Sequence, residues 1–255
     1  MLLVMDVGNS NTVLGVYDGT RLLAHWRLTT VRDRTVDEYG VLARNLFSIA
    51  AIEARSIDGL IIASVVPPLN GVLEEMARVY LKLKPLFVEP GIKTGMPILY
   101  ENPQEVGADR IVNGVAAFER FKSAVIVVDF GTATTFDAIS SRGEYLGGAI
   151  APGLAISAEA LFQRAARLPR VDIRRPPHVI GRNTTHSVQS GLFHGYVSLV
   201  SGILSRMREE VGEPARTIGT GGLLVPLEAE LRALLDTLDP DLTLEGLRII
   251  YDRNR

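Results

Sequence analysis

The sequence of 255 residues contains no cysteine, which excludes disulfide bonds, zinc–thiolate sites, iron–sulfur clusters and cysteine nucleophiles together. It also lacks an excess of either charge: 27 Lys and Arg stand against 29 Asp and Glu, so the net charge of −2 gives no general attraction to nucleic acid or anionic membranes. No apolar stretch approaches the roughly 20 residues that span a bilayer, and the apolar N-terminal run is too short for a signal peptide. We therefore expect a cytoplasmic, globular protein that binds neither nucleic acid nor membrane.

Several well-known catalytic motifs are missing as well. None of the four lysines follows a glycine, so the chain has no P-loop, and no Gly-x-Gly-x-x-Gly follows the first predicted strand. A Gly-x-Ser-x-Gly nucleophile elbow is also absent. The four histidines are too scattered to predict a zinc site without cysteines. Any nucleotide must therefore be held by another kind of turn.

Hydrophobic periodicity predicts both strands and helices, in a chain long enough to bury a core without disulfides or a metal. The opening is a three-stranded meander in which a turn of small polar residues, Gly8 to Asn11, joins the first two strands. A helix start is predicted at Asn102-Pro103, where an N-cap residue precedes proline and then Glu105. The predicted strands cover 2–6, 12–17, 21–28, 60–64, 124–128, a stretch through 139 and 217–218, and the predicted helices cover 36–49, 69–81, 103 onward, 153–168, 187–211, 226–238 and 243–251, the last capped by Thr243.

A repeat relates the two halves of the chain. Asp6 and Asp129 each end an apolar strand, and the same offset of 123 residues aligns Gly8 with Gly131 and Thr12 with Thr135. Both copies contain strand, Asp-x-Gly turn and strand. We interpret them as duplicated half-domains, residues 1–120 and 121–255, that share a cleft.

The two turns have the chemistry of a phosphate site. Glycine and small hydroxyl or amide residues present main-chain N–H groups with little bulk, which suits phosphate oxygens. Asp6 and Asp129 would each hold a cation rather than a phosphate, and the Gly219–Gly222 turn would let a flat ring approach bare backbone. For one such turn alone, an ordinary hairpin is the simpler interpretation; two related copies favour a polyphosphate site.

The helix predicted from Pro103 carries an acid–base candidate. Glu105, Asp109 and Asn113 recur every four residues and so would share one face. Asp109 could accept the proton of a bound hydroxyl, and Arg110 could hold a carboxylate or phosphate in a forked geometry. Arg110 would lower the pKa of Asp109 and Glu105 would raise it, and the sequence leaves the balance open. A solvated helix face remains the alternative.

A basic stretch lies between residues 164 and 182. It contains six arginines, with few aromatic residues between them. The pattern favours a solvated face or a subunit contact over a nucleic-acid site.

Four motifs together resemble those of type III pantothenate kinases. They are Asp6-Val-Gly-Asn-Ser-Asn-Thr12, Gly107-Ala-Asp-Arg110, Asp129-Phe-Gly-Thr-Ala-Thr-Thr135 and Gly147-Gly-Ala-Ile-Ala-Pro-Gly153, in the family's order and spacing. The resemblance extends over the whole chain. Ser10 stands where the family commonly has threonine, which keeps the hydroxyl.

The resemblance implies a homodimeric α/β protein with duplicated actin-like (ribonuclease H-like) ATPase domains and a central cleft. It implies transfer of the γ-phosphoryl group of ATP to pantothenate, the first step of coenzyme A biosynthesis, with Mg²⁺ and a monovalent cation, K⁺ or NH₄⁺. Asp109 would be the general base and Asp129 the ligand of the monovalent cation. The implied ATP-binding residues are Asp6, Val7, Gly8, Asn9, Ser10, Asn11, Thr12, Val13 and Thr132, and the implied pantothenate-binding residues are Tyr100, Gly107, Ala108, Asp109, Arg110 and Thr184.

Two alternatives stay open. One is a non-catalytic, nucleotide-binding accessory protein of transcription that also resembles this family. The other is a sugar kinase or exopolyphosphatase of the same superfamily, although such proteins usually carry larger inserted subdomains than 255 residues can hold.

Overall fold

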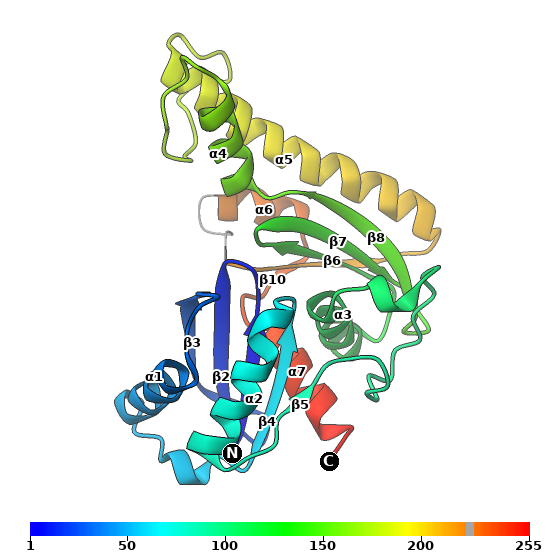
Figure 1. Cartoon of the computed structure of the whole chain (residues 1–255). Coiled ribbons are helices and arrows are strands. Elements are labelled where there is room, and N and C mark those ends of the chain that lie inside the picture. Colours follow the sequence, from blue (N-terminus) through cyan, green and yellow to red (C-terminus); the bar gives the residue numbers. More distant parts are fainter. Residues whose placement is uncertain (223–226) are drawn as a thin grey trace. The chain divides into compact units, whose positions relative to one another are not determined.

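The computed structural model describes residues 1–222 and 227–255, which form two compact units (Figure 1). Unit 1 comprises Met1–Met96, Asn102–Ala116 and Thr243–Arg255, and unit 2 comprises Pro97–Glu101 and Ala117–Leu242. The C-terminal segment thus groups with unit 1. The division of the chain into halves at residue 120 stays a prediction.

Unit 1 is built on a mixed five-stranded sheet. Strand β1 runs antiparallel to β2, to which a tight turn joins it. It runs parallel to β4, which the chain reaches after a crossover that contains helix α1 (Val36–Ile49). The sheet order is β3-β2-β1-β4-β5, with β1 Leu2–Val7, β2 Asn11–Asp18, β3 Arg21–Thr29, β4 Gly59–Ser64 and β5 Leu86–Phe87.

Helices cover both faces of this sheet. Helix α1 begins with a capping box between Thr35 and Glu38, and its Phe47 is buried in a core shared with β1, β4 and α2 (Asn70–Met76). On the opposite face lies α7 (Leu242–Asp252): a Cβ added to Gly15 of β2 would approach the Leu244 side chain to 3.0 Å. The chain before and after α2 continues as a 3₁₀ turn, Pro67–Leu69, and a π turn, Ala77–Leu81, and a further 3₁₀ turn covers Ala54–Ser56.

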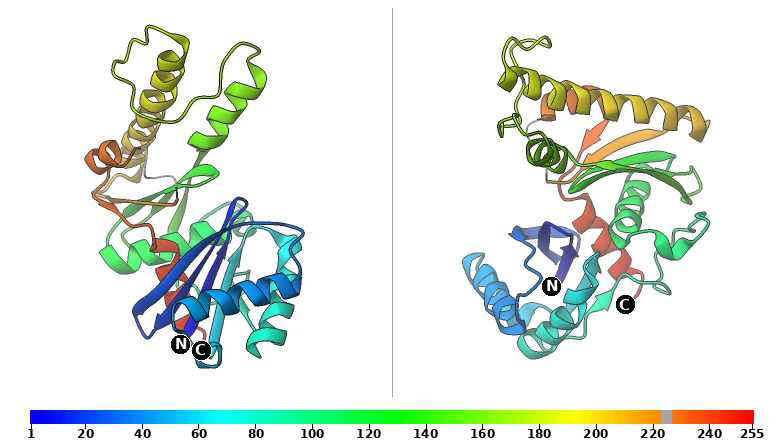
Figure 2. Two further views of the ribbon diagram at one scale, coloured as in Figure 1. Left: turned by 90° about the vertical axis from the view of Figure 1, so that its left-hand side faces the viewer. Right: turned by 45° about the horizontal axis from the view of Figure 1, so that its top comes forward.

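Unit 2 contains a second mixed sheet, of order β10-β9-β6-β7-β8. Its apolar face, which includes Val128 and Phe130, packs against α5 and α6, and Figure 2 shows α5 lying along that sheet. The elements are β6 Val125–Phe130, β7 Ala133–Ile139, β8 Tyr145–Pro152, β9 Arg216–Thr220, β10 Thr237–Leu238, α4 Leu154–Arg164, α5 Thr184–Val211 and α6 Glu228–Leu234. Helix α3, Ala108–Phe121, contributes residues to both units.

The two sheets repeat one topology, which confirms the repeat and corrects one of its equivalences. Strands β1 and β6 match at the predicted offset of 123 residues. However, Asp6 pairs with Val13, whereas Asp129 pairs with Thr135, so the second turn is one residue shorter. Thr12 therefore corresponds to Thr134, not to Thr135. Both Thr12 and Thr134 are fully buried.

Most predicted elements are present, and the corrections are local. Strands β5, β8 and β10 were not predicted, because two are two residues long and the third is rich in glycine. Thr243 is not a cap: α7 begins at Leu242, and the Thr243 hydroxyl donates to Asn113 Oδ1 at 2.7 Å. The helix predicted over 226–238 is shorter, and its start at Pro226 lies outside the described residues. No helix in residues 1–222 or 227–255 has both the length and the apolar content to cross a bilayer.

Candidate active site

The first turn, between β1 and β2, is closed and anchored by its own hydrogen bonds. Gly8 N–H donates to the Asn11 carbonyl at 3.0 Å, and the Thr30 hydroxyl, from the residue after β3, donates to the Gly8 carbonyl at 2.8 Å. The hydroxyls of Thr12 and Thr30 lie 2.9 Å apart. The residues at the tip, 9–11, are exposed, and Asp6 at the end of β1 is half-buried. The turn therefore presents small polar groups on a rigid base.

The Gly107 segment lies at the same edge of the unit 1 sheet. Strands β1, β4 and β5 are parallel to one another, so their carboxyl ends meet there, and Val65 N–H donates to the Val7 carbonyl at 3.0 Å. A pocket of about 300 Å³ at this edge is lined by residues after β4 and β5 and by 104–108. In open α/β sheets, ligands bind outside the carboxyl ends of the strands. The structure thus brings the first turn and the Gly107 segment to one edge.

Asp109 stands in the first turn of α3 with its carboxylate folded back over the preceding residues. Oδ1 accepts the main-chain N–H of Arg110 at 2.8 Å, and a Cβ added to Gly107 would lie 2.6 Å from Oδ1. Burial raises the pKa of the Asp109 carboxyl above its ordinary value, against the lowering effects of the Arg110 N–H and guanidinium. Arg110 itself is buried.

The prediction that Glu105, Asp109 and Asn113 share one helix face is wrong for Glu105. Glu105 belongs to a separate 3₁₀ turn, Pro103–Glu105, and Val106 is extended, so α3 begins only at Ala108. Glu105 Oε1 accepts the Asn102 side-chain amide at 2.9 Å. The balance that the sequence left open is therefore decided by desolvation of Asp109.

The second turn, between β6 and β7, contacts the main chain of a glycine that precedes α4. Gly131 N–H donates to the Ala133 carbonyl at 3.0 Å, and Gly153 N–H donates to the Thr132 carbonyl at 3.0 Å. A Cβ added to Gly153 would lie 2.3 Å from that carbonyl oxygen, so only glycine fits where α4 begins. The Thr132 side chain is exposed. Behind the turn, the Thr134 hydroxyl bonds to the Tyr196 hydroxyl of α5.

Asp129 lies on the face of the unit 2 sheet that is turned away from Val128 and Phe130. Its register partners are Thr220 on β9 and Thr135 on β7. Residues paired in neighbouring strands project to the same face, so the three side chains form one row across the sheet. The Thr135 hydroxyl donates to Asp137 Oδ2 at 3.2 Å. Thr220 Oγ1 is buried and has no hydrogen-bond partner among residues 1–222 and 227–255.

This row of oxygens suits a cation. A carboxylate and two hydroxyls are hard ligands, and a buried hydroxyl without a partner leaves lone pairs to be satisfied. The predicted role of Asp129 is therefore compatible with its surroundings.

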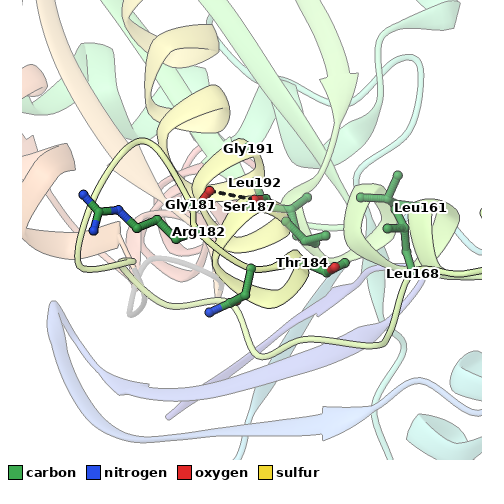
Figure 3. Close-up of a pocket in the computed structure, with 10 residues that line it drawn as sticks. Leu161, Leu168, Gly181, Arg182, Thr184, Ser187, Gly191 and Leu192 are labelled. Atoms are coloured by element: carbon green, nitrogen blue, oxygen red, sulfur yellow. Dashed lines mark hydrogen bonds between the residues drawn. The ribbon is translucent and has the colours of Figure 1, made fainter.

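The remaining predicted residues lie elsewhere in unit 2. A Cβ added to Gly147 of β8 would lie 3.7 Å from the Tyr100 ring, which also packs edge-on against Tyr145 at 6.3 Å between ring centroids. Thr184 is the first residue of α5, after the N-cap Asn183. It lines a pocket of about 650 Å³, where Figure 3 shows it with Leu161, Leu168 and Ser187.

Sequence reasoning missed Thr30, Tyr196 and Thr220. Each supports or adjoins a turn from a distant part of the chain, and its partner is identified only by strand register or helix packing. For Thr220, the Gly-rich turn that follows was the available signal.

Comparison with known proteins identifies the family. The sequence profile described as "Type III pantothenate kinase" matches residues 2–206. The chain belongs to the type III pantothenate kinase family. One relative, a type III pantothenate kinase from Myxococcus xanthus (strain DK1622), is 59% identical over 254 residues, which cover 100% of this chain and 99% of the relative.

Solved structures agree on the fold alone. A ROK family glucokinase from Streptomyces griseus, solved with glucose and AMPPNP, has a TM-score of 0.54 and 12% identity over 98% of both chains. A protein assigned to the Baf family of transcriptional activators, from Campylobacter jejuni, has a TM-score of 0.60 and 20% identity over 99% of this chain and 98% of its own. The α/β fold class with duplicated actin-like ATPase domains is confirmed. The cleft between the domains stays a prediction.

Proposed function

We propose that this member of the type III pantothenate kinase family transfers the γ-phosphoryl group of ATP to the primary hydroxyl of pantothenate, in the cytoplasm, as the first step of coenzyme A biosynthesis. The observation that carries the proposal is the full-length identity of 59% with a type III pantothenate kinase. An ATP-dependent kinase without a P-loop binds the triphosphate by turns of another kind. The candidates are the two Asp-x-Gly turns, one after β1 and one after β6.

ATP binding is assigned to the first turn, Asp6–Val13, and to Thr132 of the second. The exposed tip of the first turn offers main-chain N–H groups and short side chains to phosphate oxygens, and its anchoring by Thr30 supports a fixed shape. Positioning of this kind supplies most of the catalysis in phosphoryl transfer, because the transition state is loose.

Asp109 is assigned as the general base. A raised pKa makes its carboxylate a stronger proton acceptor than an ordinary aspartate. The hydrogen bond from Arg110 N–H to Oδ1 fixes the direction of the carboxylate. The base is therefore positioned before the substrate arrives.

Pantothenate binding is assigned to Tyr100, Gly107–Arg110 and Thr184. Pantothenate carries a carboxylate at one end and the reactive hydroxyl at the other. A guanidinium such as that of the buried Arg110 suits a carboxylate, and the small residues Gly107 and Ala108 line the 300 Å³ pocket. Tyr100 offers a ring and a hydroxyl, and Thr184 a hydroxyl.

Two cations belong to the proposal. Asp6 would hold Mg²⁺, and Asp129 would hold K⁺ or NH₄⁺; when bound, both would neutralise negative charge on the phosphates. The half-buried Asp6 at the end of β1 and the row of oxygens around Asp129 support these assignments.

A homodimer is also proposed, with unit 2 supplying the contact. Ile180 and Val179, which precede α5, are 83% and 66% exposed, and Phe162 of α4 is 39% exposed. Ile180 and Phe162 are the sequence neighbours of Gly181 and Leu161, which line the 650 Å³ pocket together with Thr184, so a second copy of the chain that covers these side chains would lie close to a proposed substrate residue. Two arginines of the basic stretch form ion pairs within unit 2, Arg170 with Glu159 and Arg175 with Glu230. This pairing supports a contact surface rather than a nucleic-acid site.

Label transfer tests the reaction directly. Incubation with pantothenate and ATP labelled at the γ-phosphorus should place the label in 4′-phosphopantothenate. Label that stays in ATP, or that appears only as inorganic phosphate, would overturn the proposal.

A further inference from the structure

We propose that Thr220 supplies a second protein ligand, its Oγ1 atom, to the monovalent cation at Asp129. The inference rests on the proposed cation site and extends it to a residue on another strand. It concerns binding of the ion, so it can be tested without measuring turnover.

The register of β6 and β9 places the two side chains together. Val127 pairs with Ile218 and Asp129 with Thr220, so Thr220 projects from the same face as Asp129, at the carboxyl ends of two parallel strands. The chain then turns through Gly221, which has φ +102°, and a Cβ there would lie 2.6 Å from Asp129 Oδ1. The end of β9 is thus folded closely around the Asp129 carboxylate.

The Thr220 hydroxyl is buried without any hydrogen bond in the described part of the chain. The residue is 1% exposed, and Oγ1 has no partner there. A hydroxyl in this condition is unfavourable unless something satisfies it, and valine would fill the same space on a buried strand without that cost. A cation beside the Asp129 carboxylate would bind Thr220 Oγ1 and so explain why this position holds threonine and not valine.

The other neighbour of Asp129 fits the same interpretation. Thr135 uses its proton to bond Asp137 Oδ2 at 3.2 Å, and the Tyr145 hydroxyl donates to the other oxygen of the fully buried Asp137 at 2.7 Å. With its proton committed, Thr135 Oγ1 keeps lone pairs for a further partner. The ion would then contact side-chain oxygens from three adjacent strands, and such oxygens can replace water molecules of the K⁺ hydration shell.

Thr217 provides a matched control on the same strand. It is fully buried like Thr220, but its hydroxyl donates to Asp236 Oδ2 at 3.1 Å and accepts the Asp236 N–H at 3.0 Å. Removal of this hydroxyl breaks existing bonds, whereas removal of the Thr220 hydroxyl breaks none in the described residues. The two variants should therefore affect stability and ion binding in opposite ways.

The experiment compares wild type, Thr220→Val, Thr220→Ser and Thr217→Val. Thermal unfolding is followed as KCl replaces tetramethylammonium chloride at constant ionic strength, with and without Mg-ATP, and ion binding is measured by ²⁰⁵Tl NMR with Tl⁺ as the probe. Thr220→Val should unfold no lower than wild type without K⁺, yet bind Tl⁺ about tenfold more weakly or worse. Thr220→Ser should keep Tl⁺ binding near the wild-type level. Thr217→Val should unfold at a lower temperature and keep its response to K⁺.

Two results would overturn the inference. The first concerns Thr220 alone, and the second also overturns the cation site at Asp129. If wild type responds to K⁺ and Asp129→Asn abolishes the response, unchanged Tl⁺ binding by Thr220→Val removes Thr220 from the site and leaves the Asp129 assignment in place. If wild type itself binds no Tl⁺ and shows no response to K⁺, the whole cation site is overturned.

Discussion

The carboxylate of Asp109 folds back over Gly107, at a position where any Cβ on residue 107 would approach Oδ1 to 2.6 Å. The same oxygen accepts the Arg110 main-chain N–H at 2.8 Å. The Gly-Ala-Asp-Arg motif is therefore one local structure: glycine admits the carboxylate, and the start of α3 orients it. A substrate hydroxyl would meet a carboxylate of fixed direction.

Replacement of the base should separate catalysis from nucleotide binding. Asp109→Asn should lower kcat about 100-fold or more, because general-base catalysis typically contributes that much. ATP affinity, measured by isothermal titration calorimetry, should stay near the wild-type value. Glu119→Gln, farther along the same helix, is the control and should keep full turnover. Turnover by Asp109→Asn within threefold of wild type would remove Asp109 from the mechanism.

The raised pKa of Asp109 predicts opposite effects on activity and stability. The base must be ionised, so kcat/KM should fall on acidification at a pH above the ordinary aspartate value of about 3.9. The folded state binds this proton more tightly than the unfolded chain, so the contribution of Asp109 to stability declines as pH rises through the window between the ordinary and the raised pKa. At pH 7, Asp109→Asn should therefore raise Tm while it lowers activity. A lower Tm at pH 7, or an equal gain below pH 3, would contradict the assignment.

The second turn should tolerate no side chain at residue 153. Gly153→Ala would place a methyl group 2.3 Å from the Thr132 carbonyl oxygen and so displace the turn. We expect ATP to bind about tenfold more weakly or worse, because small misplacements of binding groups are costly. Gly71→Ala in α2 is the control, since its Cβ would meet nothing within 4 Å. Equal ATP affinity of both variants would show that the turn does not bind ATP.

The proposed dimer depends on exposed apolar side chains of unit 2. Ile180→Asp should yield monomers by size-exclusion chromatography with light scattering. It should also raise KM for pantothenate, because the next residue, Gly181, lines a pocket together with Thr184. Ile49→Asp is a matched control: Ile49 is 81% exposed against 83% for Ile180, but it belongs to α1 in unit 1. A monomeric wild type, or an equal effect of both variants, would contradict the dimer contact.

Local patterns predicted much of this molecule, and non-local pairing explains what they missed. The strand–turn–strand units around Asp6 and Asp129 follow from apolar runs that end in glycine and small polar residues, which are signals within a few positions. Asn102 and Pro103 form a valid helix start and so place Glu105 in a predicted helix, but the extended Val106 ends that turn after three residues. A helix start does not reveal how far the helix continues.

Strand register is the second feature that the sequence pattern does not predict. An equal offset pairs Thr135 with Thr12 only if the two turns have equal lengths, and a one-residue difference moves every later side chain to the other face. Thr220 adjoins Asp129 only because β9 pairs with β6, across about 90 residues of intervening chain that includes α4 and α5. A pattern read along the chain contains no such pairing.

If pantothenate accepts the γ-phosphoryl group, ADP release in a coupled assay must depend on pantothenate. With Mg²⁺ and K⁺ present, we expect steady ADP release when pantothenate is added and almost none without it, and a much slower rate when Na⁺ replaces K⁺. ADP release at one rate with and without pantothenate would contradict the proposed transfer.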